Sequence, residues 1–178
     1  MTMTIFDDKF STGQVIKATG VSNPTLQSWL KRNMIIGHKE GTGIEGAGSP
    51  GVYRRFSFFN VMEIAVAKAL IDVGVKDLTA AFEVAREFAH TGDGPVFNQP
   101  GRQPSTPFNE VGITLLCVGE KRSECVHWQP GKDPLSIIFS RLKKPEGIII
   151  LHMNKLFDRV TSALGYHPEK VLQDAYAP

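Results

Sequence analysis

Two short helices separated by a glycine turn constrain this chain more than any other feature. Ser11 or Thr12 can cap the first helix, and Gly20 interrupts the helical pattern. Ser22 can cap the second helix, because a short hydroxyl side chain accepts a hydrogen bond from an otherwise unpaired backbone N–H. Pro24 then falls in the first helical turn, which needs no backbone donor from it. The sequence therefore predicts a helix-turn-helix near the amino terminus.

The second of these helices has two contrasting faces. At about 3.6 residues per turn, Leu26, Trp29 and Leu30 fall on one side, and we expect them to pack inward. The opposite arc carries polar side chains, none of them acidic, that can meet phosphates or base edges: Thr25, Gln27, Ser28, Lys31 and Arg32. A recognition helix in the major groove of DNA needs both an apolar stripe that fixes it and a donor-rich outer face.

A glycine-rich loop between two strand patterns follows the helix pair. The predicted strands are residues 34–36 and 52–56, and six of the fifteen residues from 37 to 51 are glycine. Residues 41–46 also satisfy the G-x-G-x-x-G dinucleotide fingerprint. That fingerprint holds pyrophosphate only between an entering strand and a departing helix, whereas a strand pattern follows here. We therefore interpret the loop as the tip of a wing rather than as a nucleotide site.

Four pieces of the first ninety residues occur in a characteristic order. They are STGQVIKATGVS at 11–22, TLQSW at 25–29, GVYRRFS at 51–57 and LIDVGV at 70–75. In order and spacing, these pieces resemble the winged DNA-binding domain of MerR-type regulators. The resemblance covers residues 10–89, nearly half of the chain. It implies a helix-turn-helix, a two-stranded wing and a further helix pair.

The resemblance also implies contacts with double-stranded DNA. It places Arg54 in the wing, on the DNA backbone, whereas Gln27 stands where the family usually has an arginine, so no base preference carries over. Gln27 suits an adenine edge, and Lys31 and Arg32 suit guanine or phosphate. The candidate DNA-contacting residues are Lys17, Ser22, Asn23, Thr25, Gln27, Ser28, Lys31, Arg32, Lys39, Tyr53, Arg54 and Arg55.

Positive charge is concentrated at the amino-terminal end, although the whole chain has a net charge of only +2. Residues 1–60 contain seven Lys and Arg against four Asp and Glu, a balance of +3, whereas residues 61–95 carry −3 and residues 96–178 carry +2. The excess therefore lies on the predicted DNA-reading segment, where it favours phosphate binding. Residues 1–10 contain no apolar run of signal-peptide length, and no later segment approaches the roughly 20 uninterrupted apolar residues of a membrane helix. We therefore expect a cytoplasmic protein without a membrane partner.

Two longer helices are predicted after the wing. Ser57 can cap a helix over residues 58–73, whose apolar side chains cover nearly every side. A helix of that kind is usually buried, and Gly74 ends it. Asp77 or Lys76 opens the next helix, in which apolar residues recur at i, i+3, i+4 and i+7. We expect the first of the two to join the DNA-reading segment to the rest of the chain.

Composition divides the chain into three parts. Residues 91–108 contain seven Gly and Pro and keep neither a helical nor a strand period. We therefore interpret them as a linker between a domain at 1–90 and a module at 109–178. MerR-type proteins usually continue into a long coiled-coil helix at this point, and that helix is missing here. The resemblance therefore does not supply a dimer interface.

The module from residue 109 onward combines strand and helix patterns. Strands are predicted at 111–118, 124–129 and 147–152, with a short apolar run at 135–139. Helices are expected to open at Asn154 and Pro168. The predicted fold class is therefore α+β, with a MerR-like winged helix-turn-helix domain followed by a small α+β module with its own core. We expect that module to serve self-association or sensing.

Catalytic and metal-binding motifs are not evident in the sequence. A zinc set of Cys117, Cys125, His127 and His152 has no ordinary ligand spacing, and Cys117 lies in an apolar run typical of a buried side chain. No nucleophile elbow, Walker loop, zincin helix or paired carboxylates are found. We expect a protein without enzymatic activity, metal or cofactor, whose two cysteines are reduced.

These observations favour a sequence-specific transcriptional regulator that acts as a homodimer, because one such head makes too few contacts for tight selective binding. RNA polymerase or another regulator is a further possible partner. A second hypothesis is an architectural recombination factor of the excisionase kind, which uses a related winged head. A third is an interaction adaptor whose winged fold no longer binds DNA.

Overall fold

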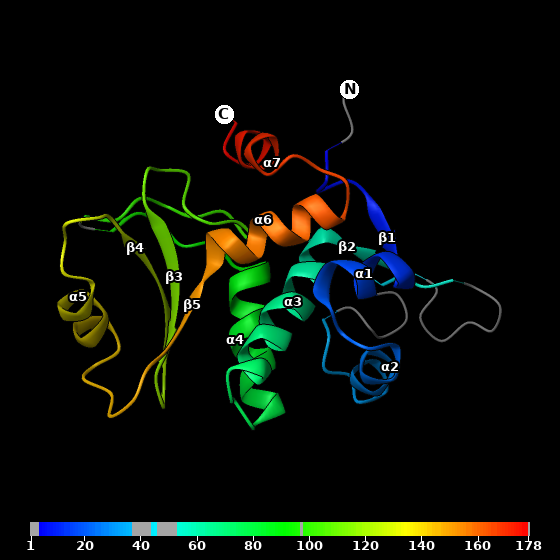
Figure 1. The fold of residues 1–178 in the computed structure, drawn as a ribbon, viewed down its shortest axis with the longest axis horizontal. Helices are drawn as coiled ribbons and strands as arrows, with labels where there is room; N and C mark the ends of the chain where they lie inside the picture. The colour runs from blue at the N-terminus through cyan, green and yellow to red at the C-terminus, as the bar shows by residue number, and fades with distance from the viewer. Residues whose placement is uncertain (1–3, 37–43, 46–52, 97, 178) are drawn as a thin grey trace.

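The computed structural model has a mixed α+β fold, as predicted, and describes residues 4–36, 44–45, 53–96 and 98–177. Within these residues the chain forms seven helices and two small antiparallel sheets (Figure 1). The helices are α1 (Thr12–Thr19), α2 (Asn23–Lys31), α3 (Phe58–Asp72), α4 (Leu78–His90), α5 (Pro134–Arg141), α6 (Met153–Ala163) and α7 (Pro168–Ala175). The strands are β1 (Lys9–Ser11), β2 (Arg55–Ser57), β3 (Ile113–Val118), β4 (Ser123–Trp128) and β5 (Ile149–His152).

The amino-terminal helix pair begins and ends where the sequence predicted. Ser11 caps α1 in a capping box with Gln14, and Ser22 caps α2 by accepting a hydrogen bond from the N–H of Thr25. Gly20 lies between the helices with a φ of 73°, a left-handed conformation that glycine adopts without steric strain. The two capped helices and the turn between them are therefore confirmed.

Helix α3 is the buried centre of the molecule, as its apolar surface predicted. Ser57 caps it in a capping box with Asn60, and most of its residues are buried. Helix α4, which begins after its cap at Asp77, lies alongside α3, while α1 and α6 pack on other sides of it (Figure 1). Helix α3 therefore connects the amino-terminal helix pair to the carboxy-terminal elements.

The prediction of a first wing strand at residues 34–36 is wrong. Strand β2 pairs instead with β1, and residues 34–36 have no strand partner within the described part of the chain. Their backbone bonds to side chains: both carboxylate oxygens of Glu63 accept from the Ile36 N–H, and Asn60 donates to the Ile36 carbonyl. Arg86 donates to the Met34 carbonyl. Because side chains of α3 and α4 form hydrogen bonds with these backbone groups, residues 34–36 need no neighbouring strand to pair with.

The second predicted wing strand, 52–56, is confirmed in part. Arg55 and Phe56 belong to β2, whereas Tyr53 and Arg54 lie just before it without strand pairing. The Arg55 N–H also donates to the carbonyl of Glu45, which forms an isolated antiparallel bridge. Most of the glycine-rich loop between residues 37 and 51, including the three glycines of its G-x-G-x-x-G stretch, lies outside the described residues, whereas Ile44 and Glu45 are described.

The Gly- and Pro-rich segment 91–108 forms no helix or extended strand in its described residues, but it is closely packed. Arg102 is buried, and its Nε forms a 2.5 Å ion pair with Asp93. Its Nη atoms donate to four backbone carbonyls, among them those of Phe88 and Thr91 at the end of α4. The guanidinium also lies 4.6 Å from the centroid of the Phe88 ring. Arg102 therefore fixes this segment to α4. The Gly and Pro content of the segment, which predicts a linker, does not predict this packing.

The carboxy-terminal sheet has the strand order β4-β3-β5, all antiparallel, and its strands fall within about two residues of their predicted ranges. The apolar run at 135–139 is helical and belongs to α5, capped by Asp133. His152, rather than Asn154, caps α6, because the last residue of β5 lies directly before the helix. Asn154 instead accepts a hydrogen bond from the N–H of Thr114 in β3.

The expected separate core of residues 109–178 is only partly present. Cys117, Val126, Ile138 and Leu142 form a small cluster beneath α5. The other face of the sheet and the inward face of α6 belong to the main core, which runs from Ile5 to Val171. Helix α6 packs on α1 and α3, so the two predicted parts share one core. Among the helices described, none is long and apolar enough to cross a membrane.

Candidate nucleic-acid interface

The inward face of α2 is anchored as the sequence predicted. Leu26, Trp29 and Leu30 are all buried, and the ring of Trp29 meets Phe82 of α4 edge to face with centroids 5.0 Å apart. This geometry is the favourable arrangement of aromatic quadrupoles. Helix α2 is therefore held at a fixed orientation on α4.

The outward face of α2 carries polar and cationic side chains. Ser28, Lys31 and Arg32 are exposed, while Thr25 and Gln27 are half-buried. Lys17 is exposed on the neighbouring helix α1. No acidic residue lies within α2, and its last turn is basic. This surface can donate hydrogen bonds and offers positive charge to an acidic polymer.

The two residues proposed to read bases and to grip the backbone contact one another directly. Arg54 Nη1 donates to Oε1 of Gln27 at 2.8 Å, and Nε2 of Gln27 donates to Oδ1 of Asn23 at 3.2 Å. Arg54 is half-buried, and its Nε has no hydrogen-bond partner among the described residues. Oε1 and Nε2 of Gln27 each already make one hydrogen bond, so release of the bond from Arg54 would leave the oxygen fully available to a base edge.

Two further candidates already have a structural role. The hydroxyl groups of Ser22 and Thr25 share a 2.7 Å hydrogen bond, and Ser22 accepts from the backbone N–H of Thr25 at 3.2 Å. These contacts complete the start of α2. Ser22 and Thr25 therefore shape the helix terminus, and any contact with DNA would be additional to that role.

A hollow of about 390 Å3 lies beside this face, where the start of α1 approaches the end of the wing. Its lining is Ser11, Thr12, Gly13, Tyr53, Arg54 and Arg55. Tyr53 is 88% exposed and Arg55 is exposed. A helix start carries partial positive charge from its unpaired N–H groups, and the two arginines add full charges. The hollow is therefore suited to a phosphate group.

Ser11, Thr12 and Gly13 were not among the sequence candidates for DNA contact. Their cap signal was recognised, but a cap alone does not reveal that the wing returns to the same helix start. The structure brings together Asn23, Gln27 and Arg54, with Arg55 and Tyr53 nearby. Lys31 and Arg32 lie farther along α2, and Lys39 lies outside the described residues.

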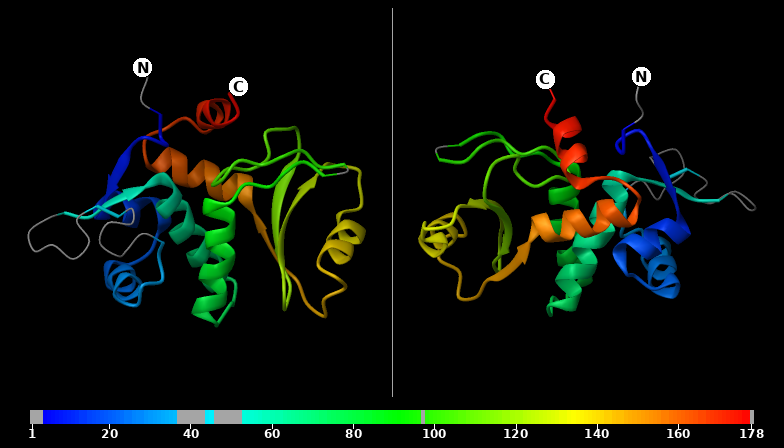
Figure 2. Two further views of the ribbon diagram at one scale, coloured as in Figure 1. Left: turned by 180° about the vertical axis from the view of Figure 1, so that it is seen from behind. Right: turned by 45° about the horizontal axis from the view of Figure 1, so that its top comes forward.

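The carboxy-terminal elements support the helix pair from behind and leave α2 open. Arg159 of α6 donates from Nη1 to the Ala18 carbonyl of α1 at 2.8 Å. The hydroxyl of Tyr166 donates to the Asp8 carboxylate; burial, followed by this bond, raises the pKa of Tyr166 to about 12. Helix α2 lies at the end of the molecule away from the three-stranded sheet (Figure 2). The polar face of α2 is therefore accessible.

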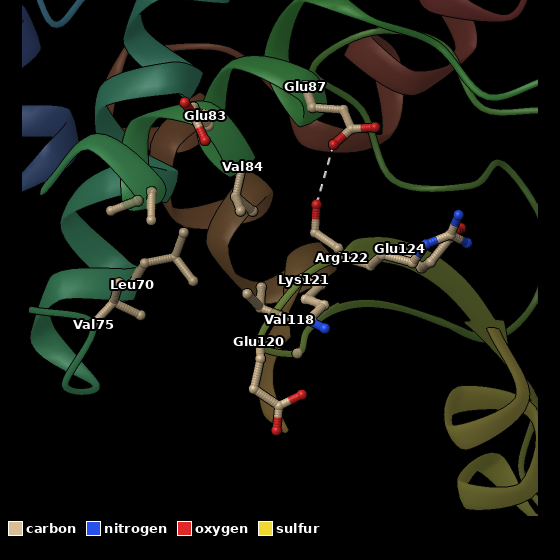
Figure 3. Close-up of a pocket in the computed structure, with 14 residues that line it drawn as sticks. Leu70, Val75, Glu83, Val84, Glu87, Val118, Glu120, Lys121, Arg122 and Glu124 are labelled. Carbon is tan, nitrogen blue, oxygen red and sulfur yellow. Dashed lines mark hydrogen bonds between the residues drawn. The ribbon is translucent and has the colours of Figure 1, made fainter. Parts of the chain in front are cut away.

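A second hollow, of about 490 Å3, lies between α4 and the turn from β3 to β4 (Figure 3). Its apolar lining includes Leu70, Val75, Val84 and Val118, while six charged side chains surround it: Glu83, Glu87, Glu120, Lys121, Arg122 and Glu124. Ser123 donates to the Glu87 carboxylate at 3.1 Å, and burial raises the pKa of Glu124. This hollow does not include α1, α2 or β2 and is separate from the candidate interface.

The two cysteines lie on opposite faces of the three-stranded sheet. Leu116 is paired with Cys125, so Cys117, the next residue in β3, points to the other side. Both thiols are free and buried, and burial raises the pKa of each to about 12. Within the described residues, no three or more His, Cys, Asp and Glu side chains are grouped so as to hold a metal ion.

Comparison with known proteins does not place the chain in a family. Its sequence matches no protein-family model and no curated protein.

Proposed function

We propose that the protein is a sequence-specific DNA-binding transcriptional regulator of the MerR type, which acts as a dimer. In this proposal α2 enters the major groove, and the segment at Tyr53–Arg55 contacts the adjacent backbone. The observation that carries the proposal is the two-sided character of α2. Its apolar residues are buried in the core, where Trp29 contacts Phe82 of α4, while Ser28, Lys31 and Arg32 are exposed within the described part of the chain.

The contact between Arg54 and Gln27 gives the proposal a specific mechanism. A phosphate that enters the hollow at the start of α1 would attract the Arg54 guanidinium away from the Gln27 carbonyl oxygen. Gln27 would then be able to use that oxygen toward a base edge. In this proposal, the contact of Arg54 with the DNA backbone and the contact of Gln27 with a base are linked through the hydrogen bond between the two side chains.

A salt titration tests the proposal. Fragments selected from genomic DNA would be labelled, and binding would be followed by fluorescence anisotropy at several salt concentrations. The logarithm of the affinity should fall linearly with the logarithm of salt, with a slope of about 0.9 per phosphate contacted. Arg54→Ala should reduce the slope by about one and weaken binding to all fragments. Lys170→Ala, at an exposed position on α7, is the matched control and should leave the slope unchanged.

The same experiment separates the competing functions. Absence of binding to any fragment would favour an interaction adaptor instead, and binding without salt dependence would contradict the proposed phosphate contacts. Footprints on arrayed sites with strong bending would favour an architectural recombination factor. Affinity that concentrates on single sites upstream of genes would support the regulator.

A further inference from the structure

The three-stranded sheet ends in a short edge strand, β5, that contains no Lys, Arg, Asp, Glu or Pro. Strand β3 pairs with one side of β5, and no strand pairs with its other side within the described residues. Edge strands are commonly guarded by a charged side chain, a proline or a bulge, because their unpaired N–H and C=O groups can recruit another strand. The stretch from Gly147 to His152 reads GIIILH and has no such guard.

The opposite edge of the sheet, β4, is better protected. The side-chain carbonyl of Gln99 accepts a hydrogen bond from the backbone N–H of His127 at 3.2 Å. Ser123, at the other end of β4, bonds to Glu87 of α4, and Glu124 adds a charge. Segment 91–108 therefore occupies part of the β4 edge through Gln99, whereas the residues of β5 present an apolar edge.

The side chains of β5 alternate between a buried and an open face. Leu151 is buried in the main core, and Ile149 packs against it. Ile150, paired with Cys117 on the other face, is 43% exposed, a large value for an isoleucine within a strand. Three further large apolar side chains of α5, which packs on that same face, are exposed: Leu135, Ile137 and Phe139. The open face of this sheet is therefore unusually apolar for a surface exposed to water.

We propose that β5 pairs antiparallel with β5 of a second copy of this chain, which joins the two sheets into one of six strands. A two-fold axis through Ile150 would set Ile150 against its own copy and Ile149 against Leu151 of the second copy. All of these cross-strand pairs are apolar. The axis also sets Gly147 opposite the residue that begins α6 of the second copy, where the absence of a side chain leaves room.

The symmetry of this pairing suits the proposed function. The choice of a second copy of the chain as the partner of β5 rests on that function. When two copies pair their edge strands antiparallel, the two-fold axis stands perpendicular to the sheet. The same face of the sheet in both copies then lies on the same side of the extended sheet. The main core, with α3, α4 and α6, packs on the face that contains Leu116 and Leu151. The helical layers of both copies, with their α2 helices, would therefore lie on the same side of the extended sheet. A two-fold symmetric DNA site requires that arrangement.

The strand is short, so the expected association is modest. Four or five paired residues and one exposed isoleucine bury less surface than a standard stable interface of about 1,600 Å2. We therefore expect a dimer that forms reversibly at micromolar concentrations and is reinforced when both copies hold one DNA fragment.

Disulfide trapping of the full-length chain tests the pairing and its register. Residues directly opposite in an antiparallel pair have Cα atoms about 4.5–5.5 Å apart, within the range that a disulfide spans. Ile150→Cys should therefore form a covalent dimer under mild oxidation. His152→Cys alone should not, because it would face residue 148, but a mixture of Ile148→Cys and His152→Cys proteins should cross-link. The native cysteines are buried and should not interfere.

Sedimentation analysis without DNA supplies the second measurement. The wild-type chain should show a concentration-dependent shift toward twice its mass, and Ile150→Lys should weaken association at least tenfold, because two ammonium groups would face each other. Val111→Lys, at a position that is 89% exposed outside the sheet, is the matched control. Circular dichroism of each variant would confirm that the fold is retained.

The results that would overturn the β5 pairing differ from the results that would overturn the proposed DNA-binding function. A wild-type chain that stays monomeric, a dimer unaffected by Ile150→Lys, or cross-linking at position 152 but not at 150 would overturn the pairing. None of these results involves DNA, so they would leave the proposed DNA-binding role of α2 and the wing unaffected. A chain that dimerises through β5 yet binds no DNA would overturn the function alone.

Discussion

The two ends of the molecule expose opposite kinds of side chain. At the amino-terminal end, α2 buries its apolar residues and presents Ser28, Lys31 and Arg32 to solvent. At the carboxy-terminal end, α5 and β5 expose four large apolar side chains: Leu135, Ile137, Phe139 and Ile150. Within the described residues, these are the exposed large apolar side chains that belong to a helix or strand.

This difference separates two kinds of recognition. A polar, cationic surface on a firmly anchored helix is suited to a charged polymer, while an apolar edge is suited to another protein surface. The shared core between them means that neither end needs to fold alone. In the proposals made above, the molecule has a DNA-binding face and a self-association face, and both are built on one shared core.

The largest effect is expected where the polar face is anchored. Trp29→Ala removes a buried ring that meets Phe82 edge to face, and should lower the free energy of unfolding by about 3–5 kcal/mol. Urea unfolding followed by circular dichroism would measure it. Arg32→Ala, an exposed change on the same helix, should shift stability by less than about 0.5 kcal/mol. Equal effects of the two substitutions would mean that α2 is not anchored as described.

A second large effect tests whether the two ends share one stable unit. Arg102→Met keeps an unbranched apolar stem but removes the guanidinium, with its ion pair to Asp93 and its bonds to four carbonyls. We expect a loss of about 3 kcal/mol, because these buried acceptors would have no donor. The single unfolding transition should move as a whole. Two separate transitions, one unchanged, would restore the interpretation of 91–108 as a linker between independent domains.

An intermediate effect tests the link between Arg54 and Gln27. The two residues share a 2.8 Å hydrogen bond, so their substitutions should not be additive in DNA affinity. A double-mutant cycle with Arg54→Ala and Gln27→Ala should give a coupling energy of about 1 kcal/mol, read from anisotropy titrations. Lys31→Ala combined with Arg54→Ala is the control cycle and should be additive. Additivity in both cycles would remove the proposed link between backbone gripping and base reading.

The smallest effect concerns how well the three-stranded sheet and its packing shield the two buried cysteine thiols from solvent. Burial raises the pKa of both Cys117 and Cys125 to about 12, so the native thiols should stay neutral where unfolded thiols ionise, near pH 9. Their contribution to stability is present below about pH 9 and is lost as pH rises toward 12. A thiol reagent at pH 8 should label the native chain far more slowly than the urea-unfolded chain. Rapid native labelling would show that the sheet opens readily.

Much of the helical structure follows from neighbouring residues. The sequence predicts caps at Ser22 and Ser57, and it offers Ser11 or Thr12 and Asp77 or Lys76 for two other helices. The structure has Ser22 and Ser57 as predicted, and Ser11 and Asp77 from the alternatives. The burial of Leu26, Trp29 and Leu30 followed from their spacing. These features depend on residues no more than four positions apart, so a linear pattern is enough to reveal them.

Contacts between distant residues were not predicted from the sequence. The first wing strand was expected at 34–36 because its residues are apolar, but Glu63 and Asn60 satisfy that backbone and β1 takes its place beside β2. The composition of segment 91–108 predicts a linker, because a single buried arginine such as Arg102 leaves no periodic pattern in the sequence. The apolar run in α5 was too short to reveal a helix.

By itself, the sequence determined a capped helix pair with one polar face, a buried central helix and a mixed α+β chain. Only the tertiary structure decided that Arg54 reaches Gln27, that Arg159 supports α1 from 141 residues away, and that β5 ends the sheet without a guard. The physical reason is the range of the interactions. Caps and amphipathic faces are set within one or two helical turns, whereas the partner of a guanidinium or of a strand edge depends on how the whole core packs.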